Sequence, residues 1–255
     1  MSATRGRLIV LPESAYPMFA AEVPERVLLY LGRTAAARNG DVLAGMFTAD
    51  PPLPGREDVR YYNSVVSLGA GDVQVYRKRH LVPFGETIPL EPIVGWFIRS
   101  VLAIPLADQT PGEPGQPPFA VAGQCVAVNI CYEDAFGSEL RSPAQDATLL
   151  VNVTNDAWYG HSLAAEQHNQ IGAMRALESG RPLLRATNTG ITSAIDYQGR
   201  ELARLPWFTR GILEVEVTGR QGTTPYVRWG DALTAALAGA LLAAALVAAR
   251  RRPAP

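Results

Sequence analysis

The alternation of short apolar runs with helical stretches limits the fold of this sequence most strongly. Each run has about five to eight residues, a usual length for a strand, and many are bounded by glycine, proline or asparagine. The predicted strands are residues 7–11, 41–47, 61–68, 73–77, 125–130, 147–153, 183–187, 191–197, 201–205 and 212–217, and the predicted helices are residues 24–38, 135–145 and 162–178. Such a mixture is typical of an α/β or α+β layered domain.

The composition indicates a folded chain with no general affinity for nucleic acid. Hydrophobic residues make up 47% of the 255 residues and charged residues 18%, which permits a sizeable core and excludes a largely disordered chain. The formal net charge of −1 does not provide the basic face that nucleic-acid-binding proteins normally carry. The length suits one large domain or two small ones.

The two cysteines, Cys125 and Cys131, are expected to be free thiols. They lie six residues apart on one predicted strand, and a rise of about 3.3 Å per residue separates them by roughly 20 Å, whereas a disulfide needs Cα atoms within about 7 Å. No clustered Cys or His spacing indicates a zinc site. Cys125 lies inside the strand and is interpreted as structural.

Cys131 is the stronger candidate for chemistry, because it stands where the strand gives way to a predicted helix. Backbone N–H groups of the following turn can lower a thiol pKa and bind an oxyanion. The alternative is a buried cysteine that acts as a small hydrophobe, which is the commoner fate of a lone cysteine.

Two charged residues follow other predicted strands. Glu13 comes after the first strand and Pro12, where burial could make it a general base; a loop carboxylate or helix cap is the alternative. Lys78 ends the hairpin strand and precedes the apolar, turn-forming residues 81–86. A lysine in such a low-dielectric pocket could stabilise an oxyanion, although basic residues in such runs are usually solvated.

An aromatic pair and two histidines complete the candidates. Trp158 and Tyr159 follow the strand 147–153 and could form a lid or an apolar substrate contact; the alternative is an anchor that packs a loop. His161 and His168 could pair with a cysteine, but nothing in the spacing places either beside Cys131, so helix or loop roles are favoured.

Residues 232–249 contain no charge and no proline. Eighteen such residues are at the lower limit for crossing a bilayer core of about 30 Å, and a buried or surface helix of a soluble domain is the alternative. Arg250, Arg251 and Arg252 follow at once. The positive-inside rule would place them in the cytoplasm and the rest of the chain on the other side of the membrane.

The three candidate residues occur in the motifs LPESAYP, YRKRHLVPFGE and NICYED. In that order they resemble the Glu–Lys–Cys triad of the nitrilase, or carbon–nitrogen hydrolase, superfamily. The longer segments LVPFGETIPL, ICYEDAF, LLVNVTNDAWYG, EQHNQIGAMRALESGRPLLRATNTGITSAID and TPYVRWGD resemble the periplasmic catalytic domain of bacterial apolipoprotein N-acyltransferases. The resemblance covers about residues 8–231.

The resemblance implies a nitrilase-like α-β-β-α sandwich over residues 1–230, one transmembrane helix over 231–249 and a basic cytoplasmic tail over 250–255. Members of this family carry several transmembrane helices and an initial strand before the part that contains Glu13. The chain is therefore expected to lack the N-terminal membrane region of the family.

The resemblance also assigns roles. Cys131 is expected to attack a phospholipid ester and form a thioester, with Glu13 as general base and Lys78 at the oxyanion. Supporting roles are expected for Glu86, Tyr132 and Glu133, and a lid role for Trp158 and Tyr159. The acyl chain then passes to the N-terminal amine of a diacylglyceryl-cysteine apolipoprotein. No metal or cofactor is implied.

The implied partners are a phospholipid donor, an apolipoprotein acceptor and the membrane. The implied location is the bacterial inner membrane, with the catalytic domain on its periplasmic side; the sequence carries no signal for an oligomeric state. Three alternatives remain. The chain could be a soluble amidase with the same triad, or a non-catalytic remnant that binds lipoproteins or a partner. It could also be a Cys–His peptidase, but the sequence offers no histidine at a suitable spacing from Cys131.

Overall fold

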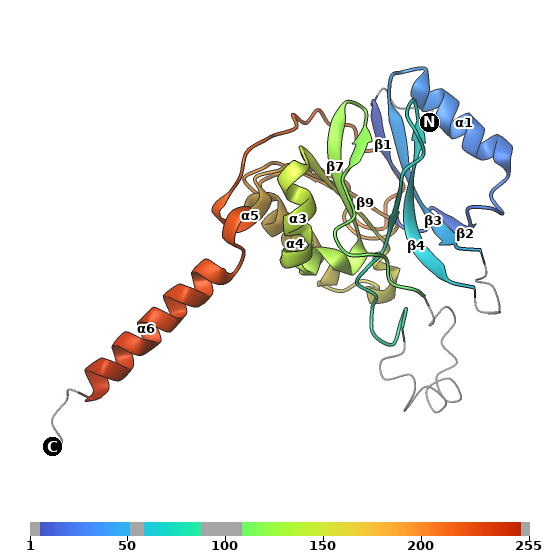
Figure 1. Cartoon of the computed structure of the whole chain (residues 1–255). Coiled ribbons are helices and arrows are strands. Elements are labelled where there is room, and N and C mark those ends of the chain that lie inside the picture. Colours follow the sequence, from blue (N-terminus) through green and yellow to red (C-terminus); the bar gives the residue numbers. More distant parts are fainter. Residues whose placement is uncertain (1–5, 52–58, 88–108, 251–255) are drawn as a thin grey trace, which may run out of the picture.

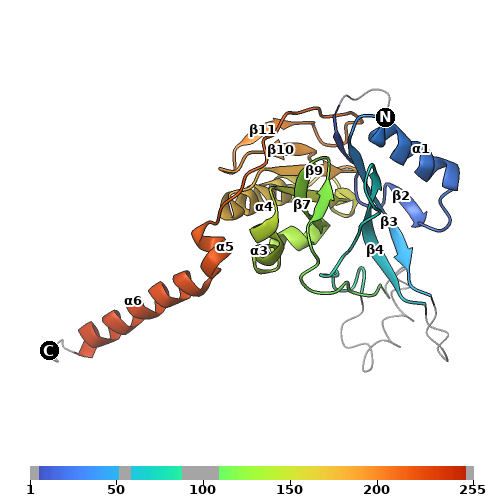
Figure 2. The same cartoon turned by 45° about the horizontal axis from the view of Figure 1, so that its top comes forward.

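A computed structural model describes residues 6–51, 59–87 and 109–250. Its strands form two sheets, and each sheet carries helices on its outer face (Figure 1, Figure 2). The first sheet contains β1 (Leu8–Val10), β2 (Tyr16–Phe19), β3 (Asp41–Ala49), β4 (Tyr61–Gly69) and β5 (Val75–Arg77). The second contains β6 (Phe119–Val121), β7 (Gln124–Ile130), β8 (Leu149–Thr154), β9 (Leu183–Thr187), β10 (Ser193–Ile195) and β11 (Glu201–Arg204).

The helices connect the strands or follow them. The α-helices are α1 (Glu25–Ala36), α3 (Gly137–Asp146), α4 (Ala164–Ser179), α5 (Pro225–Trp229) and α6 (Ala232–Arg250), and the 3₁₀ helices are η1 (Cys131–Ala135) and η2 (Asp156–Tyr159). The first sheet has the order β1-β3-β4-β5, with β2 also paired to β3. The second has the order β11-β10-β9-β8-β7-β6, and its central pairs β7–β8 and β8–β9 are parallel.

Three apolar clusters show why the chain folds into four layers. Successive side chains of a strand point to opposite faces, so β3 sends Val42, Ala44 and Met46 into the cluster with α1 and sends Leu43 into the cluster between the sheets. The third cluster joins Ala127, Leu150, Leu183 and Ile195 of the second sheet to Leu140 of α3 and Ala176 of α4. The order helix, sheet, sheet, helix is the predicted α-β-β-α sandwich.

Some predicted elements differ from the structure. Residues 212–217 do not form the predicted strand: Ile212 and Val215 are exposed, and Val217 packs against the core at its edge. Alternating apolar residues are compatible with a strand, but within the described residues no strand pairs with this segment. The short strands β2 and β6 were not predicted. Cys125 lies inside β7, as predicted, and is exposed.

The C-terminal helix α6 extends away from the sandwich (Figure 1). Its leucine side chains are exposed, among them Leu237 and Leu241. Within the described parts of the chain, no helix combines the length and apolar character required to cross a membrane, so the membrane span predicted for residues 232–249 is not confirmed.

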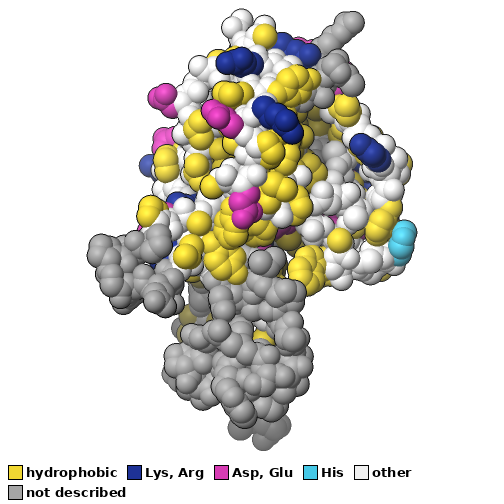
Figure 3. Space-filling view, turned by 90° about the vertical axis from the view of Figure 1, so that its right-hand side faces the viewer, with side chains coloured by type: hydrophobic (Ala, Val, Ile, Leu, Met, Phe, Trp, Pro, Cys, Tyr) yellow, Lys and Arg dark blue, Asp and Glu magenta, His cyan; other side chains and the backbone are white. Residues whose placement is uncertain are grey.

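On the side of the molecule where α1 and β2 lie, apolar side chains are spread across the face and interspersed with basic ones (Figure 3).

Candidate active site

Cys131 lies at the junction between β7 and η1, as the sequence predicts. Its backbone adopts φ +53°, a left-handed conformation that costs a non-glycine residue about 1–2 kcal/mol. The Cys131 carbonyl accepts a hydrogen bond from Asn152 Nδ2 at 3.2 Å and lies 3.2 Å from His168 Nε2. These contacts from β8 and α4 hold the strained residue in place, an arrangement that is common at functional sites.

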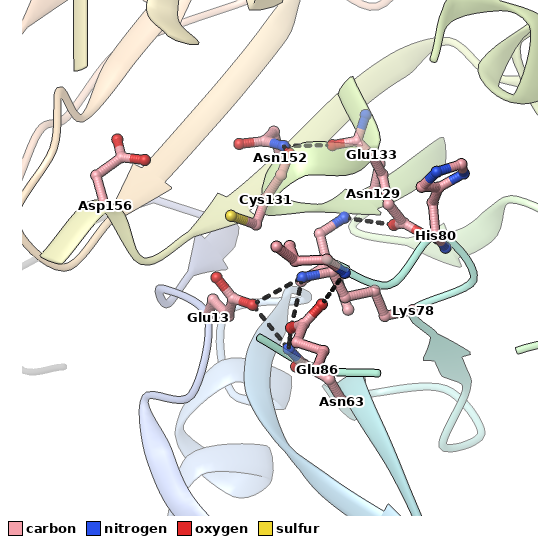
Figure 4. Close-up of polar contacts among 12 residues, drawn as sticks. Glu13, Asn63, Lys78, His80, Glu86, Asn129, Cys131, Glu133, Asn152 and Asp156 are labelled. Atoms are coloured by element: carbon pink, nitrogen blue, oxygen red, sulfur yellow. Dashed lines mark hydrogen bonds and ion pairs between the residues drawn. The ribbon is translucent and has the colours of Figure 1, made fainter. Parts of the chain in front are cut away.

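Lys78 lies between two carboxylates, and its side chain is 1% exposed. Its Nζ donates to Glu86 Oε1 at 2.7 Å and to Glu13 Oε1 at 3.4 Å. Asn63 Nδ2 donates to the same oxygens, at 2.7 Å for Glu13 and 3.5 Å for Glu86. In Figure 4 the Cys131 sulfur points to the side on which Glu13 lies, so the structure brings the predicted Glu13, Lys78, Cys131 and Glu86 together.

Three separate segments deliver these side chains. The Glu13 turn lies against β3, where a Cβ on Gly45 would come within 2.5 Å of the Pro12 carbonyl oxygen, so glycine is required at that close approach. Asn188 Nδ2 donates to the Glu13 carbonyl at 2.8 Å. The backbone N–H of Lys78 donates to the Asn63 carbonyl at 2.8 Å, which fixes the end of β5 to β4.

The charges in this cluster shift the pKa values of Lys78 and Cys131. Burial disfavours the ammonium of Lys78, but the negative charges of Glu13, Cys131 and Glu86 outweigh it and raise the lysine pKa above its ordinary value. Burial and then the Glu13 charge raise the pKa of the Cys131 thiol to about 12, against the lowering effect of Lys78. In the resting state the site therefore holds a neutral thiol and a cationic lysine, and the thiol must lose its proton during attack.

Tyr132 and Glu133 follow the nucleophile in the sequence. Among the hydrogen bonds of the described residues, Lys78 Nζ donates to Glu13 and Glu86 and not to either of them. Glu133 Oε1 accepts from the backbone N–H groups of Arg79 at 2.6 Å and His80 at 3.1 Å, and Oε2 accepts from that of Ile130 at 2.7 Å. Burial raises the pKa of Glu133 to about 7, against those three hydrogen bonds. Glu133 thus fixes the segment after Lys78 to the end of β7.

The aromatic residues surround the site at different depths. Tyr132 packs edge-to-face against His80 and Phe136, with ring centroids 5.8 and 5.0 Å away. Trp158 and Tyr159 lie on η2, where their residues are 75% and 46% exposed. Both side chains are therefore accessible from solvent.

His168 is the main residue whose contacts the sequence did not reveal. Its Nδ1 lies 2.8 Å from Asp156 Oδ1, and its Nε2 lies 3.0 Å from Asp134 Oδ1 as well as beside the Cys131 carbonyl. Arg185 Nη1 donates to Asp134 Oδ2 at 2.8 Å. All partners of the ring are acceptors, so both ring nitrogens donate only in the imidazolium form.

The protonation of His168 gives a pH-dependent prediction. Burial and Arg185 lower its pKa, but hydrogen bonds to Asp134 and Asp156 outweigh them and raise it. A raised native pKa stabilises the fold fully below the ordinary value of about 6.5 and loses that effect as pH rises through the native value. His168→Gln is expected to cost about 1.5–3 kcal/mol at pH 6 and less at pH 9, measured by urea unfolding.

His161→Gln is the matched control for that experiment, because His161 stacks on Phe208 at 4.0 Å on the exposed surface. It is expected to unfold like the unmodified chain at both pH values. A deficit of His168→Gln that is the same at pH 6 and pH 9 would contradict this prediction, because it would show that folding leaves the pKa of the ring unchanged.

Two further sequence signals point to the site, one to the predicted Lys78 and one to Asn63, which was not predicted. Lys78 is the only lysine in the sequence, which singles it out from the arginine-rich run around it. Asn63 interrupts a buried strand of the sequence YYNSVVSLG, and a buried polar side chain needs a partner. The strand pattern of β4 contains this signal, whereas the partner of Asn63 becomes visible only in the folded chain.

Comparisons with known proteins show which proteins this chain resembles. A family model described as carbon-nitrogen hydrolase matches residues 3–226. An apolipoprotein N-acyltransferase of Nitrosomonas europaea is 51% identical over 243 residues, which cover 95% of this chain and 48% of that protein. One of Ralstonia nicotianae is 47% identical over 252 residues, which cover 96% and 46%. The chain thus spans about half the length of these curated relatives.

The fold also occurs in a solved structure. The crystal structure of the C. elegans NitFhit protein superposes with a TM-score of 0.58 and 16% sequence identity, covering 79% of this chain and 50% of that one. At this identity the likeness concerns the fold alone. The four-layer architecture and the family match over residues 3–226 together assign the chain: it belongs to the carbon-nitrogen hydrolase family.

Proposed function

We propose that this chain transfers a fatty acyl group from a phospholipid to the N-terminal amine of a diacylglyceryl-cysteine apolipoprotein. The observation that carries the proposal is the buried Glu13–Lys78–Glu86 cluster facing Cys131. A cysteine, a carboxylate base and a fixed cation are the groups that thioester chemistry needs. The choice of lipid and lipoprotein substrates follows the names of the relatives, apolipoprotein N-acyltransferase.

In the first half-reaction the Cys131 sulfur attacks the ester carbonyl of the phospholipid. Because the thiol pKa is raised to about 12, little thiolate exists beforehand, and Glu13 accepts the proton as the C–S bond forms. Lys78 stabilises the negative oxygen of the tetrahedral intermediate. Collapse of this intermediate breaks the ester C–O bond, and the lysophospholipid leaves with a proton returned by Glu13.

In the second half-reaction the α-amine of the lipoprotein attacks the thioester. Glu13 accepts the amine proton and Lys78 again stabilises the oxyanion. The C–N bond forms, the C–S bond breaks, and the Cys131 sulfur regains its proton. The exposed Trp158 and Tyr159 are proposed to cover the acyl group against water, because a transferase must exclude hydrolysis.

The site is further proposed to work at the inner membrane, with residues 6–230 on its extracytoplasmic side and the C-terminus in the cytoplasm. The exposed leucines of α6 and the following Arg250–Arg252 run support this arrangement. Both substrates are lipid-anchored, so a site held at the bilayer surface reaches them without drawing an acyl chain into water. Protease digestion of residues 6–230 from the cytoplasmic side of sealed vesicles would contradict it.

The test of the function is the product of a two-substrate assay. The chain is reconstituted in phospholipid vesicles, and mass spectrometry follows first the protein and then an added diacylglyceryl-cysteine peptide. An acyl adduct on Cys131 that is sensitive to hydroxylamine, and that passes to the peptide amine, is expected. Release of ammonia from simple amides without peptide acylation would instead support an amidase. An adduct on Cys125 would refute the assignment of the nucleophile.

A further inference from the structure

The proposed thioester would form next to an amine of the protein itself. Lys78 Nζ must approach the carbonyl oxygen closely to stabilise its charge, which also places it near the acyl carbon. A free lysine amine at that distance would attack the thioester. The C–N bond would form, the C–S bond would break, and the nitrogen would lose a proton, leaving a stable amide on Lys78 and a free Cys131 thiol.

Lys78 is the only side-chain amine with which this can happen, because the sequence contains no other lysine. The remaining cationic side chains, histidine apart, are arginines, which stay protonated at every accessible pH. An enzyme that transfers acyl groups to amines therefore has a single residue to protect. An ammonium ion has no lone pair, so protonation is sufficient protection.

Two carboxylates hold the Lys78 ammonium, and they are not equivalent. Glu13 Oε1 lies 3.4 Å from Nζ, and Glu86 Oε1 lies closer, at 2.7 Å. In the proposed mechanism Glu13 takes up a proton in each half-reaction and is then neutral. At those moments Glu86 is the carboxylate that still pairs with Lys78.

Hydrogen bonds hold the Glu86 carboxylate in place. Its Oε2 accepts the backbone N–H of Val82 at 2.9 Å, and its Oε1 also faces Asn63 Nδ2 at 3.5 Å. The other titratable groups whose charges interact with Lys78 include Cys131, Glu133 and Tyr159. The thioester of Cys131 carries no negative charge, so in the acylated protein Lys78 pairs with the carboxylates alone.

We propose that Glu86 is a positioning residue that keeps Lys78 in its non-nucleophilic ammonium form while the acyl group is on Cys131. The inference rests on the proposed function, because it requires the thioester. It assigns Glu86 a role after acylation: the carboxylate directs the acyl group to the incoming amine instead of to the enzyme.

The experiment locates the acyl group in Glu86→Gln. Each variant is acylated with a p-nitrophenyl ester of a fatty acid, which has a good leaving group, and is held without acceptor at pH 7.5. Peptide mass spectrometry then separates hydroxylamine-labile adducts on Cys131 from hydroxylamine-stable adducts on Lys78. Each unit by which the lysine pKa falls raises its free-amine fraction about tenfold, so Glu86→Gln is expected to form the Lys78 amide at least about tenfold faster than the unmodified chain.

Two further variants distinguish the protection of Lys78 against acylation from a general disturbance of the site. Glu86→Asp retains the charge and is expected to form less amide than Glu86→Gln. Glu139→Gln removes a carboxylate that contacts Arg79 and His80 and is expected to match the unmodified chain.

The outcomes distinguish this inference from the proposed function. If the unmodified chain forms no thioester, the proposed function fails. If it forms one, and Glu86→Gln either keeps a Cys131 thioester without Lys78 amide or cannot be acylated by the activated ester, the role assigned to Glu86 is overturned. Equal amide formation in Glu86→Gln and Glu139→Gln would also overturn it.

Discussion

Replacing Cys131 with alanine is expected to reduce acyl transfer to the limit of detection, a loss of at least about 10⁴-fold. Removal of a covalent nucleophile in a comparable acyl-transfer enzyme costs about 10⁶ in turnover, because no alternative group can carry the acyl chain between the two substrates. The fold should tolerate the change, since Cys131 is 7% exposed and alanine is only slightly smaller. Mass spectrometry of the acceptor peptide measures the loss.

Cys125 provides the matched control for this prediction. It is the other cysteine of the sequence, it lies in β7, the strand that leads to Cys131, and it is exposed. Cys125→Ala is expected to transfer acyl groups at the normal rate. Normal transfer by Cys131→Ala, or loss of transfer in Cys125→Ala, would reverse the roles of the two thiols.

The position of Cys131 could be predicted from the sequence because it depends on local signals. An apolar run that ends at Ile130 and gives way to polar residues indicates the end of a strand, and the structure confirms the junction of β7 with η1. Glu13 and Lys78 follow their strands in the same way. The layered α/β architecture is likewise a consequence of apolar runs at strand and helix length.

The contacts that complete the site depend on pairing between distant segments. Asn63 meets Glu13 across 50 residues of sequence, and His168 meets Asp134 across 34. Such contacts follow from strand order and from the packing of α4, neither of which a periodic pattern specifies. For the same reason residues 212–217 were wrongly predicted as a strand: the pattern describes which residues can form a strand, but not whether a partner strand is available.

Lys78→Met is expected to impair both stability and chemistry. The Lys78 side chain is 1% exposed and contacts two carboxylates. Removing one partner of a buried ion pair typically costs about 3–5 kcal/mol, since methionine fills the space but leaves Glu13 and Glu86 facing each other, with Asn63 as the donor that they share. Loss of the charge at the oxyanion is expected to reduce acylation of Cys131 by about 10²–10³-fold.

The stability deficit of Lys78→Met is expected to grow with pH. Two neighbouring carboxylates without a cation raise each other's pKa, and a raised native carboxyl pKa gives stability that is present at low pH and is lost as pH rises. Urea unfolding between pH 5 and pH 8 measures this trend. Arg79→Met is the control, because Arg79 is half-exposed, with its side chain near Glu139, and it should show no such slope.

The double variant Lys78→Met, Glu86→Gln separates the structural loss from the catalytic one. It removes one of the two facing negative charges, so it is expected to unfold at higher urea concentration than Lys78→Met alone and with a smaller dependence on pH. Acylation of Cys131 is not expected to recover, because the cation at the oxyanion is still missing. If acylation returned together with stability, Lys78 would serve only to neutralise Glu13 and Glu86, and the oxyanion would have to be stabilised by another group.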